Sequence, residues 1–97
     1  MPATYAFQAY DAAQLIDSAV RAVNGNLTDK SALRAALKKA DFKSLRGKFA
    51  FNNNHYPIQD FYLVKVAKRP DGKFQTEIAQ KVFTDYGDPH AKDCPMK

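Results

Sequence analysis

The sequence predicts a mixed α/β fold, or α+β if the chain stands alone, with two antiparallel helices followed by a strand and a β-hairpin. Apolar residues recur at three- and four-residue spacing through the first half, which is the period of a helix. Apolar and polar residues alternate in the second half, which is the period of a strand. A Pro-Asp-Gly run at residues 70–72 supplies the turn that joins two strands into a hairpin.

The first helix is defined by an apolar stripe, with Asp11 and Asp17 placed on the opposite, polar side. The stripe consists of Ala9, Ala12, Ala13, Ile16, Ala19, Val20 and Val23. Gly25 ends this helix, because glycine adopts the left-handed conformation without a Cβ penalty. Thr28 is expected to cap a second helix, and the short link between the two predicts an antiparallel pair.

The first strand is expected at residues 47–52, with Phe49 and Phe51 on one face. A polar loop at residues 52–57 separates it from the hairpin. Residues 61–68 are rich in β-branched and aromatic side chains and form the first strand of that hairpin.

The returning strand is expected at residues 74–83, with Phe74, Ile78 and Val82 facing inward. A three-stranded sheet leaves its edges open, which indicates that part of the structural unit is missing. We therefore expect one partial domain over residues 1–97, with a helical pair at 3–46, three strands at 47–83 and an irregular tail at 84–97.

Composition places the chain among globular proteins. Fifteen Lys and Arg against ten Asp and Glu give a net charge of +5, and 45% of the residues are hydrophobic. One cysteine excludes an internal disulfide framework. The first residues lack the basic and apolar regions of a secretory signal, and no apolar run approaches the length of a membrane span. A natural short gene of this sequence would thus encode a cytoplasmic protein.

Residues with catalytic or metal-binding chemistry are few and poorly arranged. Cys94 lies four residues from His90, in a tail expected to hold no fixed geometry for a nucleophile and its base. His90, Asp93 and Cys94 are three candidate ligands, whereas a structural zinc site takes four. His55 has no visible partner. We predict no enzyme activity, no metal site and no cofactor.

Carboxylate pairs give no further catalytic candidate. Asp11 and Asp17 are six residues apart, which separates them by about 120° around a helix, so within its polar side they point in different directions and do not form a pair. Asp60, Asp71 and Asp85 lie at loops or strand ends, where aspartate commonly makes turn hydrogen bonds.

Basic residues concentrate between positions 30 and 48, against the single acid Asp41. They are Lys30, Arg34, Lys38, Lys39, Lys43, Arg46 and Lys48. One interpretation is a small interaction module that binds nucleic acid or protein through this face. The other is a solvated helix surface, since stacking aromatics and an arginine-rich loop are not evident. Nucleic acid is accordingly not the expected partner.

Four runs in order give the chain a family resemblance: YDAAQL at 10–15, LRAAL at 33–37, DFKSLRGKFAFN at 41–52 and NHYPIQDFY at 54–62. Together they closely resemble the C-terminal portion of ABC-transporter solute-binding proteins of the branched-chain amino acid type. The resemblance extends from about residue 3 to residue 94. It implies a C-terminal fragment or truncated homologue of a type I periplasmic binding protein, in which two α/β lobes close on a small ligand.

The family resemblance also implies a function and a site. It implies non-catalytic capture of a branched-chain amino acid or related small organic acid, delivery to a membrane permease and a periplasmic location. An aromatic wall of the ligand site falls on Tyr5, with Tyr10 as a weaker candidate. The alternatives are packing at a helix N-terminus for Tyr5 and a place in the core for Tyr10.

Cys94 matches a cysteine that in relatives can pair with an earlier cysteine of the chain. That earlier cysteine is absent here, so the Cys94 thiol is free to bridge two molecules. Open sheet edges imply self-association.

Overall fold

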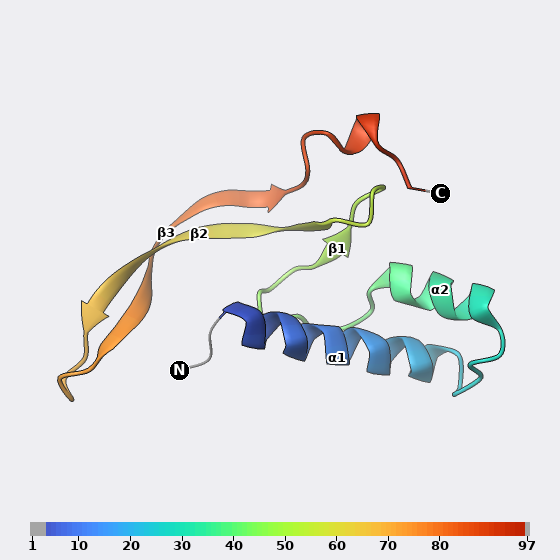
Figure 1. The fold of residues 1–97 in the computed structure, drawn as a ribbon, viewed down its shortest axis with the longest axis horizontal. Helices are drawn as coiled ribbons and strands as arrows, with labels where there is room; N and C mark the ends of the chain where they lie inside the picture. The colour runs from blue at the N-terminus through green and yellow to red at the C-terminus, as the bar shows by residue number, and fades with distance from the viewer. Residues whose placement is uncertain (1–3, 97) are drawn as a thin grey trace.

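The computed structural model describes residues 4–96 as a helix pair joined to a long antiparallel hairpin (Figure 1). The elements are α1 (Thr4–Ala22), α2 (Lys30–Lys39), β1 (Ala50–Phe51), β2 (Pro57–Lys68), β3 (Phe74–Tyr86) and the short 3-10 helix η1 (Ala91–Asp93). The expected order of two helices, a strand and a hairpin is therefore confirmed. None of the helices within the described residues has the length and apolar character needed to cross a membrane.

The two helices run antiparallel and pack on each other (Figure 1). Gly25 follows α1 with a φ of 75°, and its N–H donates to the carbonyl of Val20 at 2.9 Å, as the expected helix end requires. The predicted cap of α2 was displaced by one residue. Asp29, rather than Thr28, accepts the N–H of Ala32 at 3.0 Å, while Thr28 bonds to Asn26 instead.

The orientation of α1 differs from the predicted stripe. Ile16, expected to face inward, is 57% exposed, whereas Asp11, expected on the polar side, is 8% exposed. Ala19 does face inward, together with Ala40 at the end of α2. The reason is that α1 packs on α2 and that Asp11 bonds to the loop after α2, so the side of α1 that faces these neighbours includes Asp11 and Ala19. Leu15 and Val20 are half-buried, whereas Ala12, Ala13 and Ile16 are exposed.

A row of three phenylalanines links the helix pair to the sheet. Phe42 and Phe49 have ring centroids 5.2 Å apart, and Phe49 and Phe51 meet edge to face at 5.1 Å. Phe49 and Phe51 therefore lie together as predicted, although β1 is only two residues long. Residues 44–47 form a small turn closed by a bridge between Ser44 and Gly47, which shortens the expected strand.

The sheet has the order β1-β2-β3 and is antiparallel throughout. Both long strands exceed their predicted limits: β2 begins at Pro57 and β3 continues to Tyr86. Proline is allowed as the first residue of a strand, because no ladder N–H is needed there. The turn at residues 69–73 forms as expected, with Gly72 at a φ of 82°.

The predicted inward face of the hairpin was wrong. Phe74 is 71% exposed, Ile78 65% and Val82 49%. The ladder pairs Val64 with Ile78 but Tyr62 with Lys81, so β3 contains an extra residue between these rungs. Alternation is reversed there, and Val82 is the extra residue of a second irregularity between the rungs Tyr62–Lys81 and Phe61–Phe83, so the alternation that put it on the face of Ile78 does not hold.

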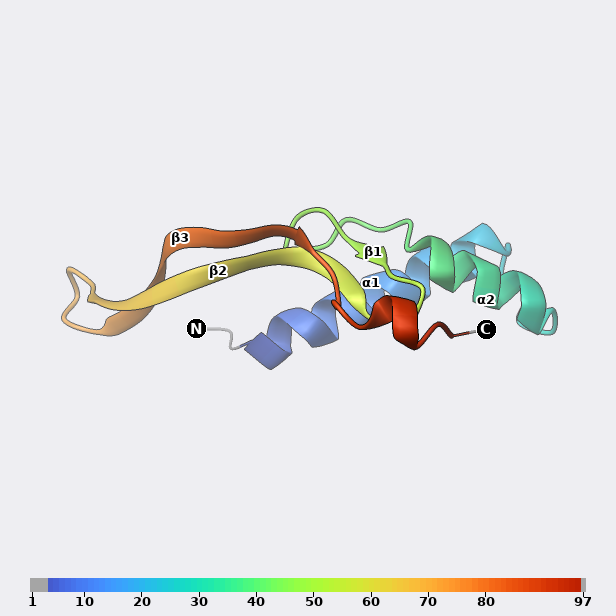
Figure 2. The same cartoon turned by 90° about the horizontal axis from the view of Figure 1, so that it is seen from above.

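The hairpin extends away from the helix pair (Figures 1 and 2). Its turn lies well beyond the first turn of α1 in both views. The chain consequently measures 53 × 33 × 16 Å. The side chains of the outer hairpin thus stand clear of the rest of residues 4–96.

The tail is more ordered than predicted. Asn54, 6% exposed, donates from Nδ2 to the Asp88 carboxylate at 2.7 Å. The N–H of Met96 donates to the carbonyl of Asn53 at 2.9 Å, and Ala91 is buried. The tail therefore docks on the loop that precedes β2, and only its residues beyond Tyr86 lie outside the sheet.

Candidate functional site

The two tyrosines predicted to contact a ligand lie in the first two turns of α1. Tyr5 is 82% exposed and Tyr10 is 50% exposed. Five residues of helix separate them by roughly 140° around the axis, so they face different directions. Tyr10 does not have the core position that was its alternative, and the Tyr5 ring is open to a partner on its side of the helix.

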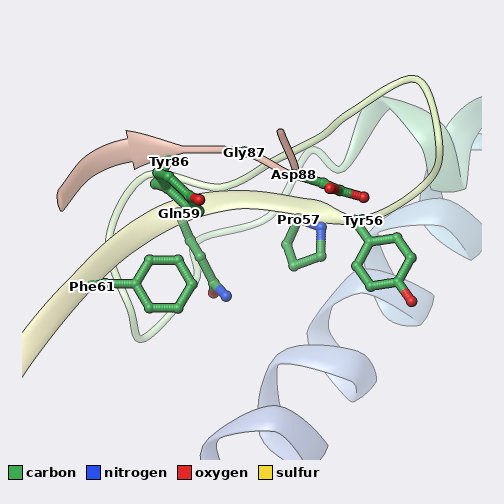
Figure 3. Close-up of a pocket in the computed structure, with 7 residues that line it drawn as sticks. All are labelled: Tyr56, Pro57, Gln59, Phe61, Tyr86, Gly87 and Asp88. Atoms are coloured by element: carbon green, nitrogen blue, oxygen red, sulfur yellow. The ribbon is translucent and has the colours of Figure 1, made fainter. Parts of the chain in front are cut away.

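A shallow hollow of about 160 Å³ lies at the base of the hairpin (Figure 3). It is lined by Tyr56, Pro57, Gln59, Phe61, Tyr86, Gly87 and Asp88. Figure 3 shows the side chains of Tyr56, Gln59 and Phe61 on the same side of β2. Phe61 meets Tyr86 edge to face with ring centroids 5.7 Å apart. The aromatic walls suit a flat apolar body, while the Asp88 carboxylate opposes an anion.

The sequence interpretation missed this hollow. Phe61 was assigned to a strand, and Tyr86 to the irregular tail. The signal in the sequence was the presence of aromatic residues near the start of β2 and at the end of β3. These residues line one hollow only because Gln59 pairs with Tyr86.

A second hollow of about 290 Å³ lies beside β1 and contains His55. Its lining residues are Lys38, Phe51, Asn52, Asn53, His55 and Met96. His55 occupies a tight turn at a φ of 62°, and its N–H donates to the carbonyl of Asn52 at 3.0 Å. This hollow brings one basic residue of α2 and an imidazole to the same opening.

Asp11 is a buried carboxylate that the sequence interpretation left on the surface. It accepts hydrogen bonds from the Ser44 hydroxyl at 2.5 Å and from the Leu45 N–H at 3.0 Å. The Ser44 oxygen in turn accepts the N–H of Arg46 at 3.0 Å. These bonds fix the loop after α2 against α1, and therefore place β1 relative to the helices.

Asp60 organises the irregular part of the hairpin. Its carboxylate accepts from Lys81 Nζ, from the N–H of Asp85 at 2.9 Å and from the Tyr62 hydroxyl at 3.3 Å. The Lys81 ammonium and then the Asp85 N–H hold the pKa of Asp60 below its ordinary value. The hydrogen bond to Asp60 raises the pKa of Lys81 in return.

Acid is expected to weaken the folded state through Asp60. Because its folded-state pKa is below the ordinary 3.8, its contribution is present above that value and disappears as the pH falls through the folded-state pKa. The urea concentration at the midpoint of unfolding should therefore fall less steeply between about pH 5 and pH 2 in Asp60→Asn than in the parent. Asp17→Asn leaves the Asp60 cluster intact and should keep the parent slope. Equal slopes in the Asp60→Asn variant and the parent would contradict the assignment.

The candidates for catalysis and metal binding are not brought together. Cys94 is a free, exposed thiol, and His90 and Asp93 belong to the turn of η1. Among the described residues, no group of three or more His, Cys, Asp or Glu side chains is placed to hold a metal ion. Asp17 pairs with Arg21 at 2.8 Å, away from Asp11.

The remaining acidic candidates have local partners. Asp71 accepts the N–H of Lys73 at 3.1 Å within the hairpin turn. Asp85 lies 3.5 Å from Lys48 Nζ in an exposed ion pair. These positions match the turn and strand-end roles expected for aspartate.

Basic residues between positions 30 and 48 are mostly solvent-exposed. Lys39 pairs with Asp41 at 3.6 Å, with both side chains more than 70% exposed. Ion pairs so exposed contribute little to stability, and the residues follow the outer side of α2 and its loop. Apart from Lys38, which lines the hollow beside β1, these residues form a solvated surface.

Comparison with known proteins gives a consistent result. Residues 1–73 match the family described as periplasmic binding protein. An ABC transporter substrate-binding protein from Sphaerobacter thermophilus is 26% identical with a TM-score of 0.77, over 86% of this chain and 22% of its own. A solute-binding protein of an ABC transporter from R. palustris, solved in complex with benzoate, is 34% identical with a TM-score of 0.72, over 88% of this chain and 22% of its own. No curated protein matches significantly.

Proposed function

The chain belongs to the periplasmic binding protein family, and we propose that it forms the C-terminal part of a solute-binding protein that captures a small organic acid for an ABC importer. The observation that carries the proposal is the 34% identity to a benzoate-bound solute-binding protein. The chain spans 22% of that protein, so most of a ligand site would come from other segments. Binding in such a site is passive and needs no catalytic group.

The ligand class follows from the relatives and from Tyr5. Benzoate in the R. palustris protein favours an aromatic or other small carboxylic acid over a branched-chain amino acid. An exposed phenol at the start of α1 offers an aromatic wall and one hydrogen bond to such a ligand. Tyr10, on another side of the helix, is a secondary contact.

Delivery to a membrane permease in the periplasm is part of the same proposal. It is supported by the descriptions of both similar structures as ABC transporter components. Self-association of the chain is a further part, supported by its many exposed apolar side chains.

A chimera tests ligand capture directly. The segment of the R. palustris protein that corresponds to this chain would be replaced with residues 1–97, and benzoate binding measured by calorimetry. We expect affinity within about tenfold of the parent, and a further loss of about tenfold with Tyr5→Ala, equal to about 1.4 kcal/mol. Tyr5→Phe keeps the ring and should lose less.

Ile16→Ala provides a matched control on the same helix. Ile16 is exposed like Tyr5 but lies about three turns further along α1, so its substitution should leave binding unchanged. A folded chimera that binds neither benzoate nor leucine would refute the proposed function. Equal affinities for the Tyr5→Ala and parent chimeras would refute only the role of Tyr5.

A further inference from the structure

The hollow at the base of the hairpin combines three aromatic rings with one carboxylate (Figure 3). The rings belong to Tyr56, Phe61 and Tyr86, and the carboxylate is that of Asp88. Phe61 and Tyr86 meet edge to face, so the pairing of β2 with β3 sets these two walls. The hollow has a volume of about 160 Å³, and a protein cavity of about 150 Å³ binds benzene. A small apolar group therefore fits it.

Asp88 is held in place by neutral donors. Its half-buried carboxylate accepts from Asn54 Nδ2 at 2.7 Å and from the N–H of His90 at 2.8 Å. Gly87 lets the chain pass close to β2 at this point, since a Cβ there would lie 3.4 Å from Ile58 Cγ1. None of the ion pairs formed within residues 4–96 involves Asp88. The hollow therefore has a fixed negative charge that no cation of residues 4–96 pairs with.

The remaining walls add to the attraction for a cation. The faces of aromatic rings carry partial negative charge. None of the described residues that line the hollow is basic. A carboxylate such as benzoate is repelled by Asp88, and no cluster of side chains suited to a metal ion is found among residues 4–96. Charge and shape together favour an organic cation.

A quaternary ammonium group fits these walls better than a primary one. Its methyl groups bury apolar surface against the rings, while its charge is attracted by the ring faces and by Asp88. A primary ammonium is strongly hydrated and loses more on leaving water. Cages of aromatic side chains are a common means of recognising choline and methylated lysine.

We propose that the hollow at the base of the hairpin is a site for a quaternary ammonium group. Tyr56, Phe61 and Tyr86 form its walls, and Asp88 is its counter-ion. The inference goes beyond the capture of an organic acid, because the ligand has the opposite charge and neither Tyr5 nor Tyr10 lines the hollow. The chimera can therefore bind benzoate while the hollow fails to bind choline, and the reverse.

The test titrates the 97-residue chain with choline and follows its backbone amide signals by nuclear magnetic resonance. We expect the amides of Phe61 and Gly87 to shift, with a dissociation constant of about 1–10 mM, because each cation–π contact at an exposed site contributes little. The neutral analogue in which carbon replaces the nitrogen of choline should bind at least about tenfold more weakly. Co-sedimentation with phosphatidylcholine vesicles would identify a lipid headgroup as the source of the ligand, and binding of free choline alone a soluble one.

Variants of the walls locate the bound choline. Phe61→Leu and Tyr56→Leu each remove a ring and keep an apolar side chain, and should raise the dissociation constant at least about threefold. Asp88→Asn removes the charge, keeps an acceptor for Asn54 and should raise it about fivefold. Tyr56 is 64% exposed, so its variant keeps the fold even where a more buried change disturbs it. Phe74→Leu is the matched control, because Phe74 lies at the far end of the hairpin and should leave binding unchanged.

Four results would overturn the inference. Absence of amide shifts at about 50 mM choline means that the hollow does not bind it. Equal affinities for choline and its neutral analogue mean that the walls select only for apolar surface. A dissociation constant unchanged in both Phe61→Leu and Tyr56→Leu places the choline elsewhere. Displacement of choline by benzoate in the chimera means that the hollow belongs to the organic-acid site.

Discussion

Replacing Asp11 with alanine is expected to lower the free energy of unfolding by about 3 kcal/mol. The carboxylate is 8% exposed and accepts hydrogen bonds from the Ser44 hydroxyl and the Leu45 N–H. Its removal leaves both donors without their acceptor at a part-buried site, and each such group is costly. Urea unfolding followed by the helical circular dichroism signal measures the loss.

Asp17→Ala is the matched control, because it removes the same side chain from the same helix. Asp17 lies on the exposed side and pairs with an arginine whose side chain is 78% exposed, so we expect a change below about 1 kcal/mol. Asp11→Asn retains one acceptor oxygen and should be intermediate. Hydrogen exchange at the Leu45 amide should accelerate in Asp11→Ala but not in Asp17→Ala. A loss below about 0.5 kcal/mol for Asp11→Ala would mean that the loop is held by other contacts.

Local patterns were sufficient to predict the helix pair, the hairpin turn and the order of elements. The signals there are short-range: a three-and-four apolar spacing, a glycine after α1 and a Pro-Asp-Gly run. The cap of α2 shows the limit of such signals. Thr28 and Asp29 both have capping side chains, and it is Asp29 that accepts the N–H of Ala32, while the Thr28 hydroxyl donates to Asn26.

Features that depend on distant partners could not be predicted in this way. Asp11 meets Ser44 across 33 residues of sequence, and Asn54 meets Asp88 across 34. Apolar periodicity places every carboxylate of a helix on its solvent side. It therefore misplaces an aspartate such as Asp11, which accepts hydrogen bonds from a distant loop and is buried.

The hairpin faces were mispredicted for a related reason. An extra residue in one strand reverses alternation from that point, and nothing in the alternation of β3 itself reveals it. The aromatic hollow at the base of the hairpin was missed with it, because Tyr86 was placed outside the sheet. The exposure of Tyr5 and Tyr10 is consistent with ligand contact, but their role remains a proposal that the chimera tests.

Titration of the 97-residue chain by itself with benzoate or leucine is expected to show no binding tighter than about 1 mM, against micromolar affinity for the completed chimera. Small-molecule sites bury most of the ligand surface, about 70–90% for drug-sized ligands. The Tyr5 ring is 82% exposed and the hollow at the hairpin base is shallow, so each offers a single wall. A ligand that rests on a single wall keeps its carboxylate in water and buries little of its apolar surface.

The expected difference between chain and chimera is about 1,000-fold, or about 4.1 kcal/mol. Calorimetry at equal protein concentration measures both. Submicromolar binding by the chain alone would show that these residues contain a complete site. Two variants would then locate that site: Phe61→Ala removes an aromatic wall of the hollow at the base of the hairpin, and Tyr5→Ala removes the exposed ring of α1. The variant that loses binding identifies the wall that the ligand contacts.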